Sequence, residues 1–358
     1  MHVWMAIVVY NLLDQSPEEL KKIMTAHGES GFRANQVLNW IYQGVYNPEH
    51  MTNLPAATRR FLKEETVCSV PGLEKLSTSK DGTKKALFRL LDGQLIEAVL
   101  MKYEHGYSVC ISTQVGCRMG CRFCASTRGG LIRNLTSGEM IGQILALSSL
   151  CGHRISNVVL MGSGEPLDNF EEVRRFLEHV SAPWGLGIGQ RHITLSTCGV
   201  APMIRAFADL DNQVTLAISL HQTTDAKRRE LMPIAQRYDL QELFDSLNYY
   251  QQKTGRRISF EFALLRDVND SLEEARALAI LLRGLKSHVN LIPLNEIEQG
   301  VFRRPDPAKV RAFQKELDRL GIETTIRREM GSDIDAACGQ LKRSYLDQGG
   351  TDHGGNDQ

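Results

Sequence analysis

Three cysteines carry the clearest chemistry in this sequence. Cys117, Cys121 and Cys124 are separated by three and then by two residues, so they form one short C-x-x-x-C-x-x-C loop. Three thiolates can hold a four-iron cluster and leave one iron without a protein ligand. A cluster needs such an open site to bind and reduce a substrate, so the loop predicts a catalytic iron–sulfur centre. Phe123, beside the third cysteine, is expected to keep water away from it.

A zinc site is the alternative interpretation of the same loop. Structural zinc takes four ligands and is usually completed by a second cysteine or histidine pair further along the chain. The sequence contains no second C-x-x-C, and Cys110 is the candidate fourth ligand. Under this alternative the chain binds zinc and has no catalytic activity.

Length and composition bound the class of protein. The 358 residues, 42% of them hydrophobic, are enough for one large domain and a smaller one. Lys+Arg and Asp+Glu are equal at 42 each, so net charge neither supports nor excludes a nucleic-acid partner. The eight cysteines and the lack of a long apolar run predict a cytoplasmic protein with no membrane segment.

Helix signals dominate the first part of the chain. Ser16 and Glu19 fit a capping box that opens one helix, and apolar spacing predicts two more at 32–43 and 56–65. Phe32 is expected on the apolar side of the second helix. Residues 1–75 are therefore predicted to form a small helical accessory domain, which is locally basic. A basic surface can contact RNA, although it is more often only a solvated face.

The rest of the chain predicts an α/β fold. Turn residues at 81–82 and 92–93 punctuate two apolar runs, which predicts a β-hairpin linker at 76–106. From there, strand-like and helical stretches alternate, the pattern of a partial (β/α)6 barrel in a core domain at 107–343. Within this domain, Thr136 with Glu139 fits a capping box that opens one helix, and Asp270 with Glu273 is expected to cap another. Residues 344–358 are polar and glycine-rich and are expected to be a disordered tail. The expected barrel strands are 108–113, 157–161, 192–196, 214–220, 258–265 and 289–293, and a further strand is expected at 322–327.

Polar residues follow the predicted strands, at the edge where β/α folds place their chemistry. In the glycine-rich turn at 162–166, Gly164 allows close approach of a ligand and Glu165 can accept a hydrogen bond from an ammonium group. The alternatives are an ordinary βα loop for this turn and a buried, hydrogen-bonded histidine at position 221. The other strand-end candidates for holding a small polar ligand are Ser196, Ser219, His221 and Asn295.

Several motifs resemble one enzyme family. The cysteine spacing is that of the radical S-adenosylmethionine (SAM) enzymes, and the chain from residue 10 to about 343 resembles the RlmN family of radical SAM methyltransferases. The most specific matches are CISTQVG at 110–116, RNL at 133–135 and GSDIDAACGQL at 331–341. The resemblance implies a radical SAM barrel, a 4Fe-4S cluster held by the three loop cysteines, and two SAM molecules for each turnover.

The resemblance also implies roles for individual residues. Cys338 would take a methyl group from the first SAM, and a radical made from the second would activate that methyl group for addition to carbon 2 of adenine. Cys110 would then release the RNA by forming a disulfide with Cys338, and Glu97 occupies the place of the proton acceptor. The SAM contacts implied are Gly164, Glu165, Ser196, Ser219, Leu220, His221 and Asn295.

The partners implied by the resemblance are 23S ribosomal RNA at the peptidyl transferase centre, transfer RNAs modified at the adenine 3′ to the anticodon, and an electron donor such as flavodoxin or ferredoxin. A monomer is expected. Two alternatives remain at this stage: a Cfr-type enzyme that methylates carbon 8 of the same adenine, and a zinc-bound RNA adaptor without catalysis.

Overall fold

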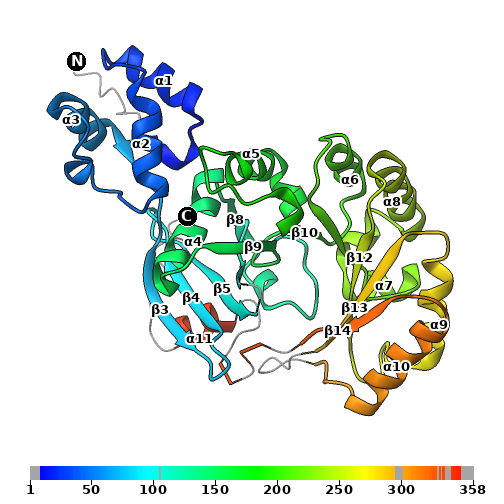
Figure 1. Cartoon of the computed structure of the whole chain (residues 1–358). Helices are drawn as coiled ribbons and strands as arrows, with labels where there is room; N and C mark the ends of the chain where they lie inside the picture. Colours follow the sequence, from blue (N-terminus) through cyan, green and yellow to red (C-terminus); the bar gives the residue numbers. More distant parts are fainter. Residues whose placement is uncertain are drawn as a thin grey trace, which may run out of the picture.

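One mixed β-sheet organises the protein. The computed structural model describes residues 9–104, 106–294, 301–328, 330–331, 333–334 and 340–347. Ten strands of the sheet follow the order β14-β13-β12-β11-β10-β9-β6-β5-β4-β3, and Figure 1 shows the sheet running from the N-terminal third of the chain to its C-terminal third. None of the helices in the described ranges is long and apolar enough to cross a membrane.

Seven neighbouring strands of this sheet are parallel and form the open barrel. Each pairs in parallel with the next, from β6 through β9 to β14. The predicted α/β barrel is therefore confirmed. The strands are β6 (Gly106–Cys110), β9 (Ile155–Leu160), β10 (Ile193–Thr197), β11 (Thr215–Ser219), β12 (Ile258–Leu264), β13 (Ser287–Pro293) and β14 (Thr324–Ile326).

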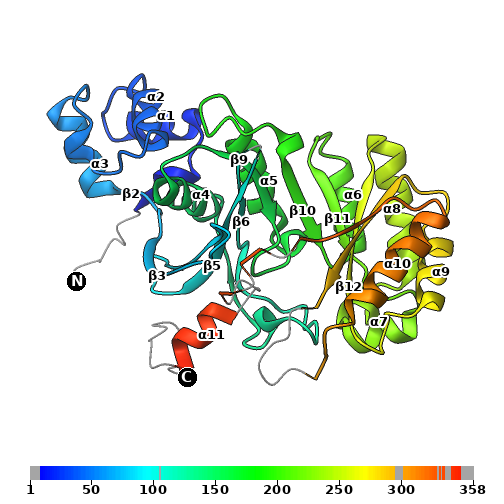
Figure 2. The ribbon, with the colours of Figure 1, turned by 60° about the horizontal axis from the view of Figure 1, so that its bottom comes forward.

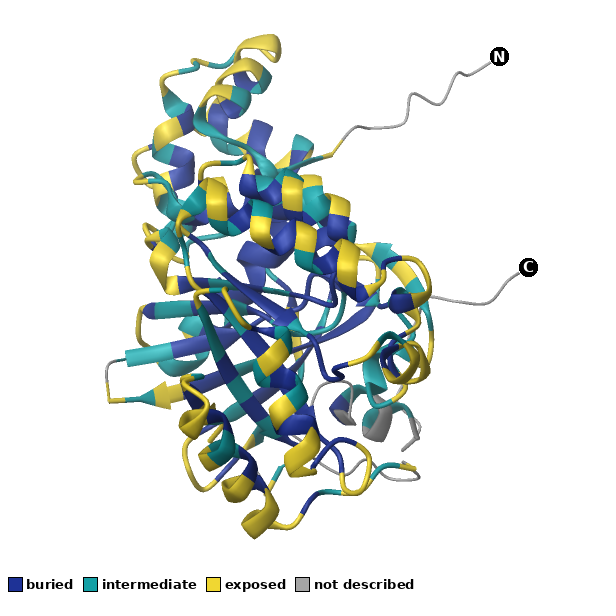
Figure 3. Ribbon diagram, turned by 90° about the vertical axis from the view of Figure 1, so that its right-hand side faces the viewer, coloured by how far each residue is buried: buried dark blue, intermediate teal, exposed yellow. Residues whose placement is uncertain are grey.

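Helices cover the outer face of these strands, as Figure 2 shows. Figure 3 shows buried residues concentrated on the strands and exposed residues on the outer sides of the helices. Because helices cover one face of the barrel strands and a lined cavity opens on the other, these strands are largely apolar, and β12 is buried at nearly every position. The covering helices are α4 (Ser137–Cys151), α5 (Phe170–Ser181), α6 (Ala201–Ala208), α7 (Asp225–Leu231), α8 (Leu240–Thr254), α9 (Leu272–Leu281) and α10 (Pro307–Arg319).

Three antiparallel strands continue the barrel sheet on the β6 side. They are β3 (Gly72–Thr78), β4 (Lys84–Arg89) and β5 (Leu95–Tyr103). The segment expected to be a hairpin linker is thus built into the same sheet as the barrel. A short helix, α11 (Gln340–Asp347), packs on this extension through Leu341, which is buried against Leu87 and Leu95.

The N-terminal module is fastened to two barrel helices. It contains α1 (Pro17–Ala26), α2 (Arg33–Tyr42), α3 (Ala56–Glu65) and a pairing of β1 (Tyr10–Asn11) with β2 (Thr66–Val67). Asp14 accepts a hydrogen bond from the N–H of Gly138 at 2.5 Å, in the first turn of α4. Arg175 on α5 forms an ion pair with Glu19 at 3.1 Å and donates to the Asp14 carbonyl at 2.5 Å.

Helix starts test the sequence predictions closely. The predicted capping box of Ser16 with Glu19 is present, and so is that of Thr136 with Glu139 on α4. A cap by Asp270 for α9 was expected and is wrong. Ser271 is the N-cap, and Asp270 instead accepts from the N–H of Asp267 at 3.0 Å.

Phe32 is a second correction. It was expected on the apolar side of α2, but it precedes the helix and is 70% exposed, with the Arg33 guanidinium 5.7 Å from its ring centroid. The buried side of α2 is formed by Ala34, Val37, Leu38 and Ile41.

Candidate active site

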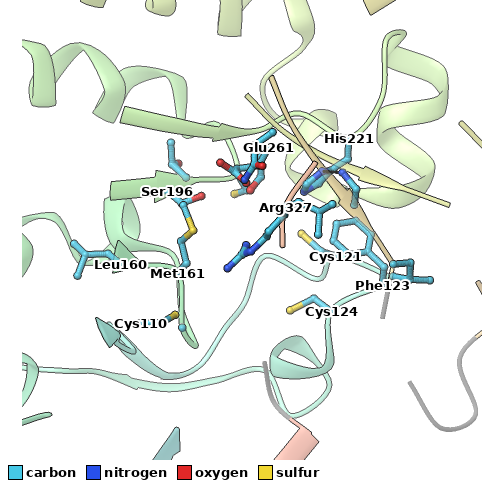
Figure 4. Close-up of a pocket in the computed structure, with 18 of the residues that line it drawn as sticks. Cys110, Cys121, Phe123, Cys124, Leu160, Met161, Ser196, His221, Glu261 and Arg327 are labelled. Atoms are coloured by element: carbon cyan, nitrogen blue, oxygen red, sulfur yellow. Dashed lines mark hydrogen bonds between the residues drawn. The ribbon is translucent and has the colours of Figure 1, made fainter. Parts of the chain in front are cut away.

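A cavity of about 620 Å³ opens at the carboxyl ends of the barrel strands. Figure 4 shows the thiols of Cys121 and Cys124 on one side of it, Cys110 and Met161 on the other, and Arg327 reaching into the space between. The predicted site residues that line this one cavity are Cys110, Cys117, Cys121, Cys124, Gly164, Glu165, Ser196, Ser219 and His221.

The cysteine loop is closed by a narrow neck. The Cys117 N–H donates to the Gly130 carbonyl at 2.8 Å, which joins the two ends of the loop. Gly116 has φ +77°, and a Cβ there would lie 2.0 Å from the same Gly130 oxygen. Only glycine therefore fits at this position, and the β7 (Gln114–Gly116) and β8 (Leu131–Asn134) pair continues the closure outward.

Contacts with the barrel fix the loop in place. The Arg122 N–H donates to the carbonyl of Leu231, the last residue of α7, at 3.0 Å. Arg118 forms a bidentate ion pair with Asp168 at 2.8 and 2.9 Å. Met119, Cys121 and Phe123 pack on an apolar cluster that includes Leu231. The loop is thus held by both polar and apolar contacts.

The burial of the loop thiols fits a metal cluster. Burial raises the pKa of Cys117 to about 12 and raises that of Cys121 well above its usual value. Thiolates at these positions therefore need the positive charge of a metal to persist at neutral pH. Among the described residues, no three His, Cys, Asp or Glu side chains are gathered as they would be around a single ion. In a four-iron cluster each thiolate binds a different iron, so three spaced thiols facing one cavity suit it.

Glu165 is held with its carboxylate oriented. Its two oxygens accept hydrogen bonds from the N–H groups of Leu167 at 3.0 Å and Cys198 at 2.7 Å. Burial raises the pKa of this carboxyl group. A neighbouring cationic ligand would stabilise the ionised form, so the site suits an ammonium group.

Gly164 lets the chain pass close to β7. Its φ is +111°, and a Cβ there would lie 2.7 Å from the side chain of Gln114. The glycine-rich turn is therefore a close approach between two backbone segments, which an ordinary βα loop does not need.

His221 is a buried, hydrogen-bonded histidine that also lines the cavity. Its Nδ1 accepts from the N–H of Ala263 at 2.9 Å, and burial lowers its pKa to about 3, so the ring is neutral. The Phe123 ring meets it edge-on, with centroids 4.9 Å apart. His221 thus links the cysteine loop to β12. It is the buried, hydrogen-bonded histidine of the alternative interpretation, and its contact with a ligand stays a prediction.

Four predicted site residues are not among the described residues that line the cavity. Leu220 is fully buried, and Asn295 and Cys338 lie outside the described residues. Glu97 does not line the cavity. It sits on β5 in a buried ion pair with Lys85 at 3.0 Å.

Glu97 belongs to a set of polar contacts that we call the C-terminal clamp. Its Oε1 accepts from the N–H of Lys342 at 2.6 Å, four residues after Cys338. Asp81 accepts from the Gly331 N–H at 2.9 Å. The clamp thus holds the chain on both sides of the cysteine segment. Its remaining contacts are Asp333 with Ser79 and the N–H of Lys80, and Tyr345 with Glu74.

Sequence reasoning predicted Ser219 but missed three polar residues that continue a row from it across the barrel. Ser219, Glu261, Asn290 and Thr325 are direct neighbours on four adjacent strands, and all line the cavity. Asn290 donates to Glu261 at 2.9 Å. A single glutamate inside an otherwise apolar strand was the available signal. Arg228, a buried arginine on α7, was also missed.

Two family models match this chain. The Radical SAM superfamily matches residues 111–279, and the ribosomal RNA large subunit methyltransferase N-terminal domain matches residues 10–68. The first range contains the cysteine loop and most of the cavity, and the second covers the N-terminal module.

Full-length relatives decide the family. A probable dual-specificity RNA methyltransferase RlmN from Clostridium botulinum is 56% identical over 337 residues, which cover 94% of this chain and 97% of the relative. The chain belongs to the RlmN family. An RlmN from Clostridium perfringens is 54% identical over 338 residues, with the same coverage of both chains.

A solved structure agrees with the RlmN assignment. A radical SAM methyltransferase from Sphaerobacter thermophilus superposes with a TM-score of 0.89 at 41% identity, covering 92% of this chain and 98% of that one. As an RlmN family member with a radical SAM domain, the chain is an enzyme that uses a 4Fe-4S cluster and SAM.

Proposed function

We propose that this RlmN family member methylates carbon 2 of an adenine in 23S ribosomal RNA, and of the adenine 3′ to the anticodon in transfer RNAs. The observation that carries the proposal is the single cavity shared by the cluster cysteines, the SAM-binding candidates and Cys110. Family membership favours carbon 2 over the Cfr-type reaction at carbon 8.

The cavity residues divide between two tasks. Cys117, Cys121 and Cys124 would hold the cluster, which supplies the single electron that cleaves SAM to methionine and a 5′-deoxyadenosyl radical. Glu165 would bind the ammonium group of SAM. Ser196, Ser219 and His221 would hold its other polar groups, together with Gly164, Leu220 and Asn295.

Two further cysteines would carry the methyl group and release the product. Cys338 accepts the methyl group, because a thiolate displaces it readily from a sulfonium. Cys110 ends β6 and lines the cavity, where it can reach an RNA tethered to Cys338 and form the disulfide that frees it. Because Cys110 lines the same cavity as the cluster cysteines, its location supports the resolving role.

We propose Glu97 as the acceptor of the carbon 2 proton. Its hydrogen bond with the N–H of Lys342 supports this role, because it joins Glu97 to the segment that carries Cys338. Glu97 also forms an ion pair with Lys85, with 3.0 Å between the Lys85 Nζ and a Glu97 carboxylate oxygen.

The proposal includes partners and location. RNA would bind the N-terminal module, at residues 1–75, and the surface around the cavity mouth. Flavodoxin or ferredoxin would supply the electron, and the chain would act as a monomer in the cytoplasm, where its thiols stay reduced.

The test is anaerobic incubation with reductant, SAM and unmodified 23S rRNA fragments or transfer RNA, followed by mass spectrometry of the nucleosides. We expect 2-methyladenine. Appearance of 8-methyladenine would establish the Cfr-type reaction. Purified protein that contains zinc, and neither iron nor acid-labile sulfide, would establish the RNA adaptor.

A further inference from the structure

Arg228 is a fully buried cation with an incomplete set of partners. It is 0% exposed, and it donates from Nη2 to the Cys198 carbonyl at 2.6 Å and from Nε to the Leu220 carbonyl at 3.4 Å. Its Nη1 is buried without a hydrogen-bond partner in the described part of the chain.

No described carboxylate neutralises this arginine. Asp225, one turn earlier on α7, attracts Arg228 electrostatically but makes no direct contact with it among the described ion pairs, and instead accepts from the Leu240 N–H at 2.8 Å. Removing an arginine from water costs several kcal/mol unless a counter-charge is present, and buried charges are normally paired. An anion that is not part of the described chain is therefore expected next to Arg228.

The location of Arg228 indicates which anion this is. Its helix ends at Leu231, which holds the cysteine loop through the Arg122 N–H at 3.0 Å. The Cys198 carbonyl that accepts from Arg228 belongs to a residue that lines the cavity, and Cys198 lies in an apolar cluster against which Cys121 of the cysteine loop packs. The cluster that joins Cys198 to the cysteine loop is apolar, so an electrostatic interaction between Arg228 and the loop is only weakly screened. The residues that pack there include Leu231, Met232, Cys198, Leu265, Leu294, Met119 and Phe123.

We propose that Arg228 is a positioning residue for the iron–sulfur cluster, whose buried and unpaired positive charge stabilises the reduced cluster and raises its reduction potential. The inference rests on the proposed function for the presence of the cluster. One electron from a reduced one-electron donor adds one negative charge to the cluster, and no bond to Arg228 forms or breaks.

The test compares three variants with the wild type. Arg228→Met removes the charge and keeps an unbranched apolar chain, whereas Arg228→Lys keeps the charge. Arg229→Gln is the matched control, because Arg229 is the next residue of the same helix and is exposed to solvent. Each full-length protein is reconstituted anaerobically, its iron and sulfide are measured, and its cluster potential is titrated by electron paramagnetic resonance without SAM or RNA.

We expect Arg228→Met to bind a full cluster whose reduced-to-oxidised ratio, at a fixed potential, falls about tenfold, a shift of about 59 mV for one electron. Arg228→Lys should restore most of this ratio, and Arg229→Gln should match the wild type. An unchanged potential in Arg228→Met overturns the proposal. A shift that appears only after SAM is added also overturns it, and assigns Arg228 to the SAM carboxylate.

The metal-free protein provides a second readout. If Arg228 serves the cluster, apo Arg228→Met should unfold at a temperature close to that of the apo wild type, because replacing an uncompensated buried charge by an apolar side chain is often neutral. A large fall in this temperature would make Arg228 a structural residue and overturn the proposal. Neither readout uses RNA, so failure of the methylation assay would leave both results interpretable.

Discussion

The cavity and the C-terminal clamp treat their charged groups in opposite ways. In the cavity, burial raises the pKa of Glu165 and of Glu261. In the clamp, hydrogen bonds lower the pKa of Asp81, chiefly through the N–H of Gly331, and the Arg89 and Tyr345 side chains lower that of Glu74 to about 2. In the cavity, burial thus disfavours the ionised carboxylates until a cationic ligand binds, whereas in the clamp the protein itself stabilises the ionised forms of Asp81 and Glu74. The first arrangement suits binding and the second suits positioning.

Removing one cluster cysteine should have the largest effect. Cys117→Ala, Cys121→Ala or Cys124→Ala leaves two thiolates, which cannot hold four irons against solvent, so we expect loss of colour, iron, sulfide and activity. Iron and sulfide analysis of anaerobically purified protein is the measurement. Cys151→Ala, on the outer helix α4, is the control and should keep its cluster. A full cluster in any of the three variants would contradict the metal assignment.

The next test separates the two cysteines outside the cluster loop. Cys338→Ala should give neither product nor RNA adduct, because the methyl carrier acts before any tether exists. Cys110→Ala should trap RNA on Cys338, because only the resolving step is lost. Denaturing gels of protein expressed in cells should show a nuclease-sensitive shifted band for Cys110→Ala alone. A shifted band for Cys338→Ala would mean that the roles are reversed.

Removing one hydrogen bond of the clamp should reduce methylation activity without changing cluster or SAM binding in the cavity. Asp81→Ala removes the acceptor for the Gly331 N–H, so the segment carrying Cys338 should be held less firmly. We expect methylation to slow several-fold while iron content and SAM affinity stay unchanged. Limited proteolysis should cut the C-terminal segment faster. Asp81→Asn keeps an acceptor oxygen and serves as the control, and equal losses in both variants would argue against anchoring.

The smallest effect concerns pH. Because burial raises its folded pKa, Glu165 protonates at a higher pH than an ordinary glutamate, and the affinity of the site for the ammonium group of SAM should weaken as the pH falls. This loss is not unfolding, since a raised carboxyl pKa makes the folded state more stable as pH falls. Three clamp carboxylates, Glu74, Asp81 and Asp333, have lowered pKa values, so their stabilisation persists until the pH falls through those values. Calorimetry between pH 8 and 5 measures the affinity for SAM, and limited proteolysis over the same range measures how firmly the clamp holds the C-terminal segment. Loss of both at the same pH would contradict the difference between cavity and clamp.

Local signals in the sequence predicted what local chemistry determines. The cysteine spacing, the capping box of Ser16 with Glu19 and the run of barrel strands each depend on residues close together in the chain. Asp81 was read only as a turn residue, yet its partner Gly331 is 250 positions away. Such a contact depends on which strands become neighbours, and no pattern around Asp81 indicates it.

Arg228 shows the same limit from the side of burial. In the sequence it lies in a charged stretch that looks like a solvated helix face, and its neighbour Arg229 is indeed exposed. Only the packing of α7 on the cysteine loop places one arginine inside and the other outside. Adjacent residues of a helix point about 100° apart, so one of the two arginines can face inward while the other faces solvent. The sequence of the helix does not indicate which of them is buried.

The attachment of the N-terminal module has a consequence for the RNA. Asp14 and Arg175 join the module to α4 and α5 with hydrogen bonds and an ion pair. These contacts hold the described part of the module at a set distance from the cavity. If RNA binds the module as we propose, the target nucleotide would reach the cavity by unstacking and swinging out of the RNA, at a cost of a few kcal/mol. Adenines that already lie in strained or looped RNA should for this reason be modified first.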